Sequence, residues 1–154
     1  MDAAYSLAKN LVNIKYDDIP REVTELTKKH ILDILGVALG GSAKPGVKEL
    51  AEVVMEWGGK AESTIFCYGR KVPAPNAAQV NATMGHALDY DDTGDGPTHP
   101  SVVIVPTCLA MAERKGKMGG RELITSIALG MDMMCRLGQA FRSGLKTAPV
   151  GGHP

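Results

Sequence analysis

Apolar residues recur three and four positions apart over most of the chain, which is the spacing that gathers them on one face of an α-helix. This pattern predicts an all-α fold of about six helices, several of them marked by a capping residue, a proline near the start or a glycine at the end. The helices expected are Asp2–Asn13 with Asp2 as its N-cap, Pro20–Gly41, Val47–Trp57, Pro75–Leu88, a helix with Pro106 in its first turn that ends at Lys115, and Gly120–Gln139.

One segment departs from the helical pattern. Ser63–Tyr68 is rich in β-branched and aromatic residues and is followed by Gly69, so we expect a short strand or an extended crossing segment there. The all-α prediction therefore includes at most one short extended segment.

The second helix carries the longest apolar stripe. We expect the residues of this stripe to face the core: Val23, Leu26, Thr27, His30, Ile31, Ile34, Leu35 and Ala38. Because His30 lies on the stripe, we interpret it as a hydrogen-bonded core histidine rather than as a ligand.

Length and charge narrow the class of partner. The chain has 154 residues, enough for one domain, and its 17 Lys and Arg balance 17 Asp and Glu. Without net charge or a basic cluster, nucleic acid is not an expected partner. The longest aliphatic run, Val102–Val105, is too short to cross a bilayer, so a membrane is not expected either and the predicted location is the cytoplasm.

The cysteines do not suggest a metal cluster or a disulfide framework. Cys67, Cys108 and Cys135 are odd in number and widely spaced, which fits neither a zinc site nor an iron–sulfur site. All three stand in apolar contexts, and we interpret them as core cysteines.

Residues 89–101, D-Y-D-D-T-G-D-G-P-T-H-P-S, are the segment richest in potential chemistry. They lack apolar periodicity and are crowded with Asp, Gly and Pro, which predicts a loop. With the preceding helix end, this loop gathers His86, Asp89, Asp91, Asp92, Thr93, Asp95 and His99. Buried carboxylates so close together need a cation or a proton, which favours a functional site. Asp91 and Asp92 bonding to backbone donors in turns is the alternative.

Metal binding offers two further interpretations of this loop. Asp89 to Asp95 matches the opening of a calcium-binding EF-hand loop, but Pro100 stands where that loop needs a bidentate Glu, so an EF-hand is not expected. A metal-dependent hydrolase built on His86, Asp89 and His99 stays open, because imidazole and carboxylate groups are suitable ligands even though the spacing fits no strong metal motif.

Several segments together carry a resemblance to a known family. They are I-L-D-I-L-G-V-A-L-G-G-S, then S-T-I-F-C-Y-G with A-P-N-A-A-Q-V-N-A-T-M-G-H, then H-A-L-D-Y-D-D-T, then T-H-P-S-V-V-I-V-P-T-C-L-A-M-A-E, and a terminal G-G-H-P. In these segments and their order, the chain resembles the MmgE/PrpD family over essentially its whole length.

The resemblance implies a lyase that works without a metal or organic cofactor on a small polycarboxylate. The activity expected is that of 2-methylcitrate dehydratase, a hydro-lyase of propionate catabolism, in a cytoplasmic homodimer. Cis-aconitate decarboxylase and iminodisuccinate epimerase activities on the same scaffold are alternatives. Each of these reactions moves a proton next to a carboxylate.

Carried over residue by residue, the family's active-site pattern falls on a short set of positions. The catalytic residues implied are Asp89, Thr93, His99 and His153, with His86 and Asp92 as supporting residues. Dehydration needs an acid and a base that both work near neutral pH, so we expect His99 and His153 to transfer protons. Asp89 is expected to orient an imidazole or contact the substrate, and Thr93 to donate a hydrogen bond to a carboxylate.

Two departures from the family pattern affect this expectation. Gly152 stands where the family usually has a bulky aromatic residue, and residues 1–154 correspond to the N-terminal part of the family's helical domain, without its second, α+β domain. We therefore expect exposed apolar faces and self-association. A catalytically silent fragment, or a helical interaction module that tolerates His99→Ala, is a further alternative.

Overall fold

The computed structural model describes residues 3–94 and 98–147, and within residues 142–147 it describes only the backbone. It confirms the predicted fold class, because six α-helices account for most of the described chain. They are α1 (Ala3–Asn13), α2 (Arg21–Gly41), α3 (Val47–Trp57), α4 (Ala74–His86), α5 (Pro100–Lys115) and α6 (Gly120–Thr147), with a 3-10 turn at Tyr16–Asp18 and the strands β1 (Ser63–Thr64) and β2 (Lys71–Val72).

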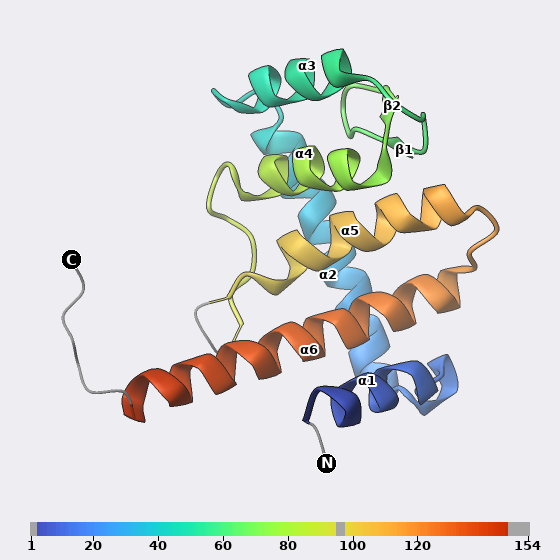
Figure 1. Cartoon of the computed structure of the whole chain (residues 1–154), viewed down its shortest axis with the longest axis vertical. Coiled ribbons are helices and arrows are strands. Elements are labelled where there is room, and N and C mark those ends of the chain that lie inside the picture. The colour runs from blue at the N-terminus through green and yellow to red at the C-terminus, as the bar shows by residue number, and fades with distance from the viewer. Residues whose placement is uncertain (1–2, 95–97, 148–154) are drawn as a thin grey trace.

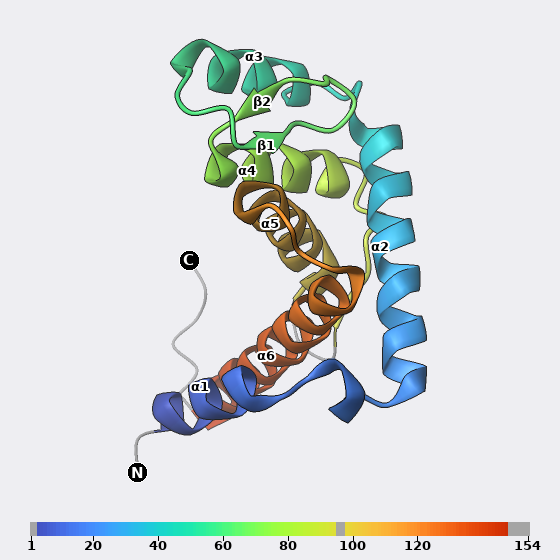
Figure 2. The same ribbon diagram turned by 90° about the vertical axis from the view of Figure 1, so that its right-hand side faces the viewer.

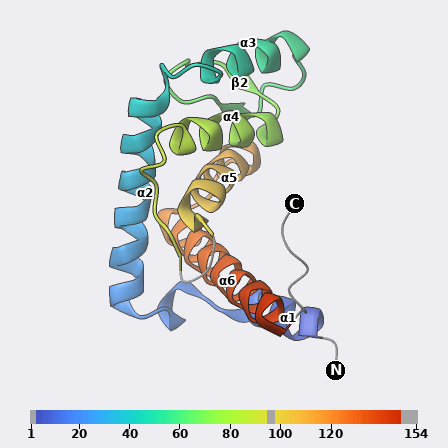
Figure 3. The same cartoon turned by 90° about the vertical axis from the view of Figure 1, so that its left-hand side faces the viewer.

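Helix α2 packs against α4, α5 and α6 along its length. In Figure 2 it runs along one side of the molecule, while α4, α5 and α6 lie one below another against it. Helix α3 and the two strands lie at one end and α1 at the other (Figure 1). This arrangement places the end of α4 against the C-terminal part of α2, and the loop that follows runs along α2 to the beginning of α5 (Figure 3).

The buried apolar residues form two clusters between the helices. One lies between α3, the strands and α4 and is built from small and aliphatic side chains: Ala38, Val47, Ala51, Val54, Ile65, Val72, Ala74, Ala77, Val80, Met84 and Ala110. The other joins α2, α5 and α6 through Ile34, Val102, Val105 and Ile127. Aliphatic and Ala side chains fill both parts, as expected of a chain with only 5% aromatic residues.

The structure adds a second strand to the single extended segment that the sequence predicts. β1 pairs with β2 in antiparallel register, Ser63 opposite Val72. The buried Asn81 of α4 holds this hairpin, because its Oδ1 accepts the Phe66 N–H at 2.8 Å and its Nδ2 donates to the Thr64 carbonyl at 3.0 Å. A two-residue strand leaves no alternating pattern to read, so β2 has no signal in the sequence.

Helix α4 spans Ala74–His86 rather than Pro75–Leu88, and two other helix boundaries differ from those predicted by more than two residues. Helix α5 begins at Pro100 rather than near Pro106, and Pro106 is buried inside the helix. Pro100 occupies the first helical position, where a missing N–H costs nothing. Helix α6 continues to Thr147, beyond the predicted end at Gln139, so Gly138 does not terminate it.

The prediction that the whole apolar stripe of α2 faces the core is partly wrong, and so is the prediction that all three cysteines are core residues. Thr27, Ile34 and Ala38 are buried, but Val23, Leu26 and Leu35 are exposed. Cys67 is also exposed, in the turn after β1, whereas Cys108 packs against the second part of the core and burial raises the pKa of its thiol. Exposed apolar side chains on α2, such as Leu32 and Leu39, agree with the expectation of uncovered apolar faces.

No helix within the described residues is both long and apolar enough to span a membrane.

The crossing of α2 and α4 gives a stability prediction. A Cβ atom at Gly41 would overlap the Met84 carbonyl oxygen, whereas one at Gly36, also in α2, would meet nothing within 4 Å. We expect Gly41→Ala to lower the free energy of unfolding by about 2 kcal/mol, because backbone must move. Gly36→Ala is the control and should raise it by about 0.5–1 kcal/mol. Urea unfolding followed by circular dichroism measures both, and equal effects would contradict the proposed close contact.

Candidate functional site

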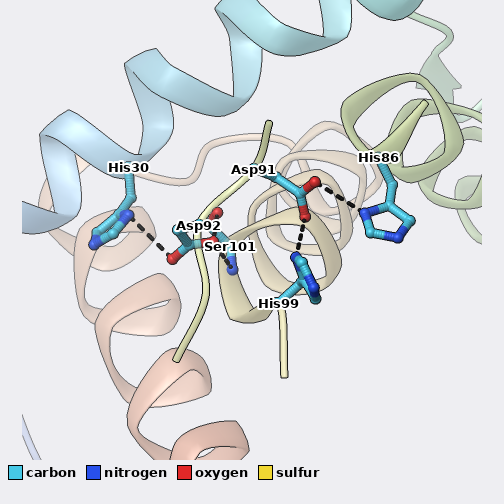
Figure 4. Close-up of polar contacts among 6 residues, drawn as sticks. All are labelled: His30, His86, Asp91, Asp92, His99 and Ser101. Carbon is cyan, nitrogen blue, oxygen red and sulfur yellow. Dashed lines mark hydrogen bonds and ion pairs between the residues drawn. The ribbon is translucent and has the colours of Figure 1, made fainter. Parts of the chain in front are cut away.

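The loop between α4 and α5 carries a buried carboxylate that bonds two imidazoles. His86 is the last residue of α4, and His99 immediately precedes α5. Asp91 lies between them: its Oδ1 is 2.9 Å from His86 Nδ1, and its Oδ2 is 3.1 Å from His99 Nδ1 (Figure 4). The Asp91 side chain has no exposed surface, whereas those of His86 and His99 are 52% and 34% exposed. One buried carboxylate therefore fixes two partly exposed rings.

The next residue, Asp92, faces the opposite way. Its Oδ2 lies 3.3 Å from Nδ1 of His30, which comes from the middle of α2. Its Oδ1 accepts hydrogen bonds from the Ser101 backbone N–H at 3.0 Å and from the Ser101 hydroxyl (Figure 4). The two neighbouring aspartates therefore contact two different groups of partners.

Asp92 also satisfies the beginning of α5. The first backbone N–H groups of a helix have no partner inside the helix, and the N-terminal end of the helix dipole favours a negative charge. His99 is the capping position of α5 and its side chain makes no capping bond. Because Asp92 supplies that bond from the loop, the His99 ring is available for Asp91.

Two cavities lie on either side of this pair of aspartates. Both imidazoles, His86 and His99, line a cavity of about 490 Å³ together with Thr83, Thr98 and Met134. Within the described chain, the Thr98 hydroxyl is a buried oxygen with no hydrogen-bond partner. A second cavity of about 350 Å³ is lined by residues that include His30, Asp92, Thr93 and Cys135. The first cavity is thus bordered by both partly exposed imidazoles.

Among the described residues, a group of side chains in the same region could hold a metal ion. One ligand atom from each of His86, Asp89, Asp91 and His99 can be chosen so that all lie within 4.8 Å of one another. In the structure, however, both Nδ1 atoms are engaged with Asp91. A metal would have to use the Nε2 atoms or displace these hydrogen bonds.

The predicted site residues are distributed between these places. Asp89 follows α4 in a left-handed conformation (φ 53°), is exposed, and belongs with the two imidazoles. Thr93 is exposed and lines the second cavity, whereas His99 lines the first. His153 and Asp95 lie outside the described residues. The catalytic roles assigned to these positions stay predictions.

Two residues of this region were missed or misjudged from the sequence. Asp91, rather than Asp89, is the carboxylate that bonds the imidazoles, and the turn interpretation of Asp91 was wrong. His30, predicted to be a hydrogen-bonded core histidine, is 22% exposed and has its Nδ1 3.3 Å from Asp92 Oδ2. The available signal in the sequence was the pair of adjacent aspartates, Asp91 and Asp92, between His86 and His99.

Comparison with known proteins agrees with this fold. Residues 5–148 match the MmgE/PrpD N-terminal domain, and the chain belongs to the MmgE/PrpD family. It is 28% identical to a cis-aconitate decarboxylase of Mus musculus over 155 residues, covering 97% of this chain and 31% of the relative.

Two further relatives carry the same name. A cis-aconitate decarboxylase of Homo sapiens is 28% identical over 136 residues, 86% of this chain and 28% of the relative. One of Aspergillus terreus is 27% identical over 133 residues, 83% of this chain and 27% of the relative. The chain spans less than a third of the length of these curated relatives.

The bonds of Asp92 give a second stability prediction. Asp92→Ala removes the acceptor for the Ser101 N–H and hydroxyl and leaves the start of α5 without an anion. We expect the free energy of unfolding to fall by roughly 2 kcal/mol, the upper range for a lost helix cap. Asp33→Ala, which removes an exposed carboxylate from α2, should change it by less than about 0.5 kcal/mol. Urea denaturation of both variants measures this change. An unchanged free energy of unfolding in Asp92→Ala would show that water replaces these bonds.

Proposed function

We propose that this chain belongs to a lyase that moves a proton next to a carboxylate of a small polycarboxylate, with His99 as a proton-transfer residue. The observation that carries the proposal is the His99 ring itself. Its Nδ1 is bonded to the buried Asp91, and the ring borders a cavity of about 490 Å³. An imidazole held by a carboxylate and open on its other side is suited to giving or taking a proton near neutral pH.

The remaining roles follow from the resemblance and complete the proposal. Asp89, exposed beside the two imidazoles, would contact the substrate, and His153 would be the second proton-transfer residue. Thr93 would donate a hydrogen bond to a substrate carboxylate. We also propose a homodimer, as the family resemblance implies.

Two compounds are the favoured candidate substrates, cis-aconitate and 2-methylcitrate. Cis-aconitate is favoured because three relatives are named cis-aconitate decarboxylases. 2-Methylcitrate follows from the sequence prediction of a dehydratase. Both molecules carry several carboxylates, and either reaction changes the proton content at a carbon next to one of them.

Turnover tests the proposal directly. Proton NMR in deuterated buffer, with cis-aconitate, 2-methylcitrate, citrate and iminodisuccinate offered separately, detects both product and simple proton exchange. We expect reaction with one of them and a loss of about a hundredfold or more in His99→Gln, the scale of a positioned acid or base. Lys28→Gln, at an exposed ion pair of α2, is the matched control and should keep normal turnover.

The outcomes separate the candidates. Silence of the unaltered chain with all four compounds would favour the alternative of a catalytically silent fragment or interaction module. Turnover that survives His99→Gln would remove His99 from the mechanism while leaving the family assignment intact.

Metal removal distinguishes the lyase from the hydrolase alternative. For a lyase that uses its imidazoles as acid and base, we expect dialysis against a chelator to leave turnover of the active substrate unchanged. Elemental analysis of the purified chain accompanies the assay. Loss of activity that zinc or manganese restores, with a stoichiometric metal in the untreated chain, would instead support a metal centre at His86, Asp89 and His99.

A further inference from the structure

The two hydrogen bonds of Asp91 determine where the protons of its partners lie. An ionised carboxylate can only accept hydrogen bonds, so a ring nitrogen bonded to it must carry a hydrogen. Asp91 has one oxygen at 2.9 Å from His86 Nδ1 and the other at 3.1 Å from His99 Nδ1. When neutral, each ring therefore has its hydrogen on Nδ1 and its lone pair on Nε2.

The opposite edges of the two rings are open to the same space. The carboxylate is fully buried, yet His86 and His99 are 52% and 34% exposed, so their accessible edges are the ones that face away from Asp91. The ring centroids are 4.9 Å apart and the planes meet at 70°. Both rings line the same cavity of about 490 Å³.

The described aspartates next to Asp91 do not take its place in these bonds. Asp92 faces His30 and Ser101 on the other side, as Figure 4 shows. Asp89 is exposed and close to the imidazoles, but Asp91 supplies the oxygen bonded to each Nδ1. The orientation of both rings therefore depends on one side chain.

We propose that Asp91 is a positioning residue that holds both imidazoles in the Nδ1–H form, and that His86 is thereby a second proton-transfer residue facing the substrate beside His99. The assignment to His86 rests on the proposed function, whereas the role of Asp91 rests on geometry alone. In this proposal His86 takes the place of His153, which the resemblance implies as the second proton-transfer residue.

In an elimination, the two rings divide the work. The neutral Nε2 of one ring takes the proton from the carbon next to the carboxylate, and the electrons of that C–H bond form the new double bond. The C–O bond breaks with its electron pair on oxygen, and the leaving hydroxyl takes a proton from Nε2 of the other ring, which enters the step protonated. Water leaves and the total number of protons is conserved.

The tautomer of each ring can be measured without any substrate. In the 154-residue chain labelled with ¹⁵N-histidine, long-range proton–nitrogen NMR spectra above the usual histidine titration range distinguish Nδ1–H from Nε2–H rings. We expect His86 and His99 both to be Nδ1–H. Either ring in the Nε2–H form in the unaltered chain would overturn the role of Asp91, and this result requires no variant to fold.

Asp91→Asn then tests the cause. An asparagine offers one oxygen and one NH₂ group, so only one ring can still donate to it and the other should change to the Nε2–H form. Asp89→Asn, which removes a neighbouring exposed carboxylate, should leave both ring signals unchanged. The His30 signal, which reports the separate contact with Asp92, shows whether the loop is still folded. Unchanged rings in a folded Asp91→Asn variant would contradict the proposal.

Activity on the substrate found by the NMR assay tests His86. We expect His86→Gln and Asp91→Asn each to lower kcat by about a hundredfold or more, with a smaller effect on KM. Full turnover by His86→Gln would overturn its proton-transfer role and leave the tautomer result standing. If the unaltered chain turns over none of the compounds, the proposed function fails, and the tautomer experiment still decides the role of Asp91.

Discussion

The arrangement of the loop depends on two adjacent carboxylates that point in opposite directions. Asp91 bonds the end of α4 through His86 and the residue before α5 through His99, while Asp92 bonds α2 through His30 and the first turn of α5 through Ser101. Three helices thus meet at two consecutive residues. Since burying a carboxylate is unfavourable without compensating partners, the fully buried Asp91 is stable there only while both imidazoles stay in place.

The fold brings these partners within reach by close packing of helices. Gly41 lets α2 lie against the backbone of α4, and Gly85 leaves room for Val102 of α5, since a Cβ atom there would come 2.8 Å from that side chain. Because His86 follows Gly85 directly, the same contact that joins α4 to α5 places the imidazole near the loop. The rigid parts of the site are helix ends, and the loop supplies the carboxylates between them. Such a division suits an acid–base group, whose position must be held while its open edge remains accessible.

The sequence predicts helices correctly where an apolar pattern extends over many residues. It does not predict features that depend on which residues of different helices touch each other. The boundaries of α3 were predicted exactly as found because apolar spacing and the glycines after Trp57 agree. The α2 stripe was only half right, because periodicity identifies a face but not which turns meet a neighbour: Ile34 is buried and Leu35 is not. Composition identified the loop as the place of the chemistry, but it did not indicate that Asp91 is the aspartate bonded to both imidazoles. Only the fold shows which of several aspartates reaches the imidazoles.

The spacing of the polar groups favours proton transfer over a metal centre. In a tetrahedral zinc site with bonds of about 2.0–2.1 Å to nitrogen, ligand atoms lie about 3.3 Å apart. The candidate ligand atoms here spread over as much as 4.8 Å, and Asp89 is already held in a left-handed turn. Asp91, by contrast, stands at ordinary hydrogen-bond distance from both imidazoles.

A carboxylate that accepts a hydrogen bond from a histidine also supports metal ligands in other proteins, so the bond to Asp91 is compatible with either chemistry. Within the described residues, the two imidazoles oriented by Asp91 border a cavity of about 490 Å³, and this geometry supports the proposed proton transfer on a small polycarboxylate.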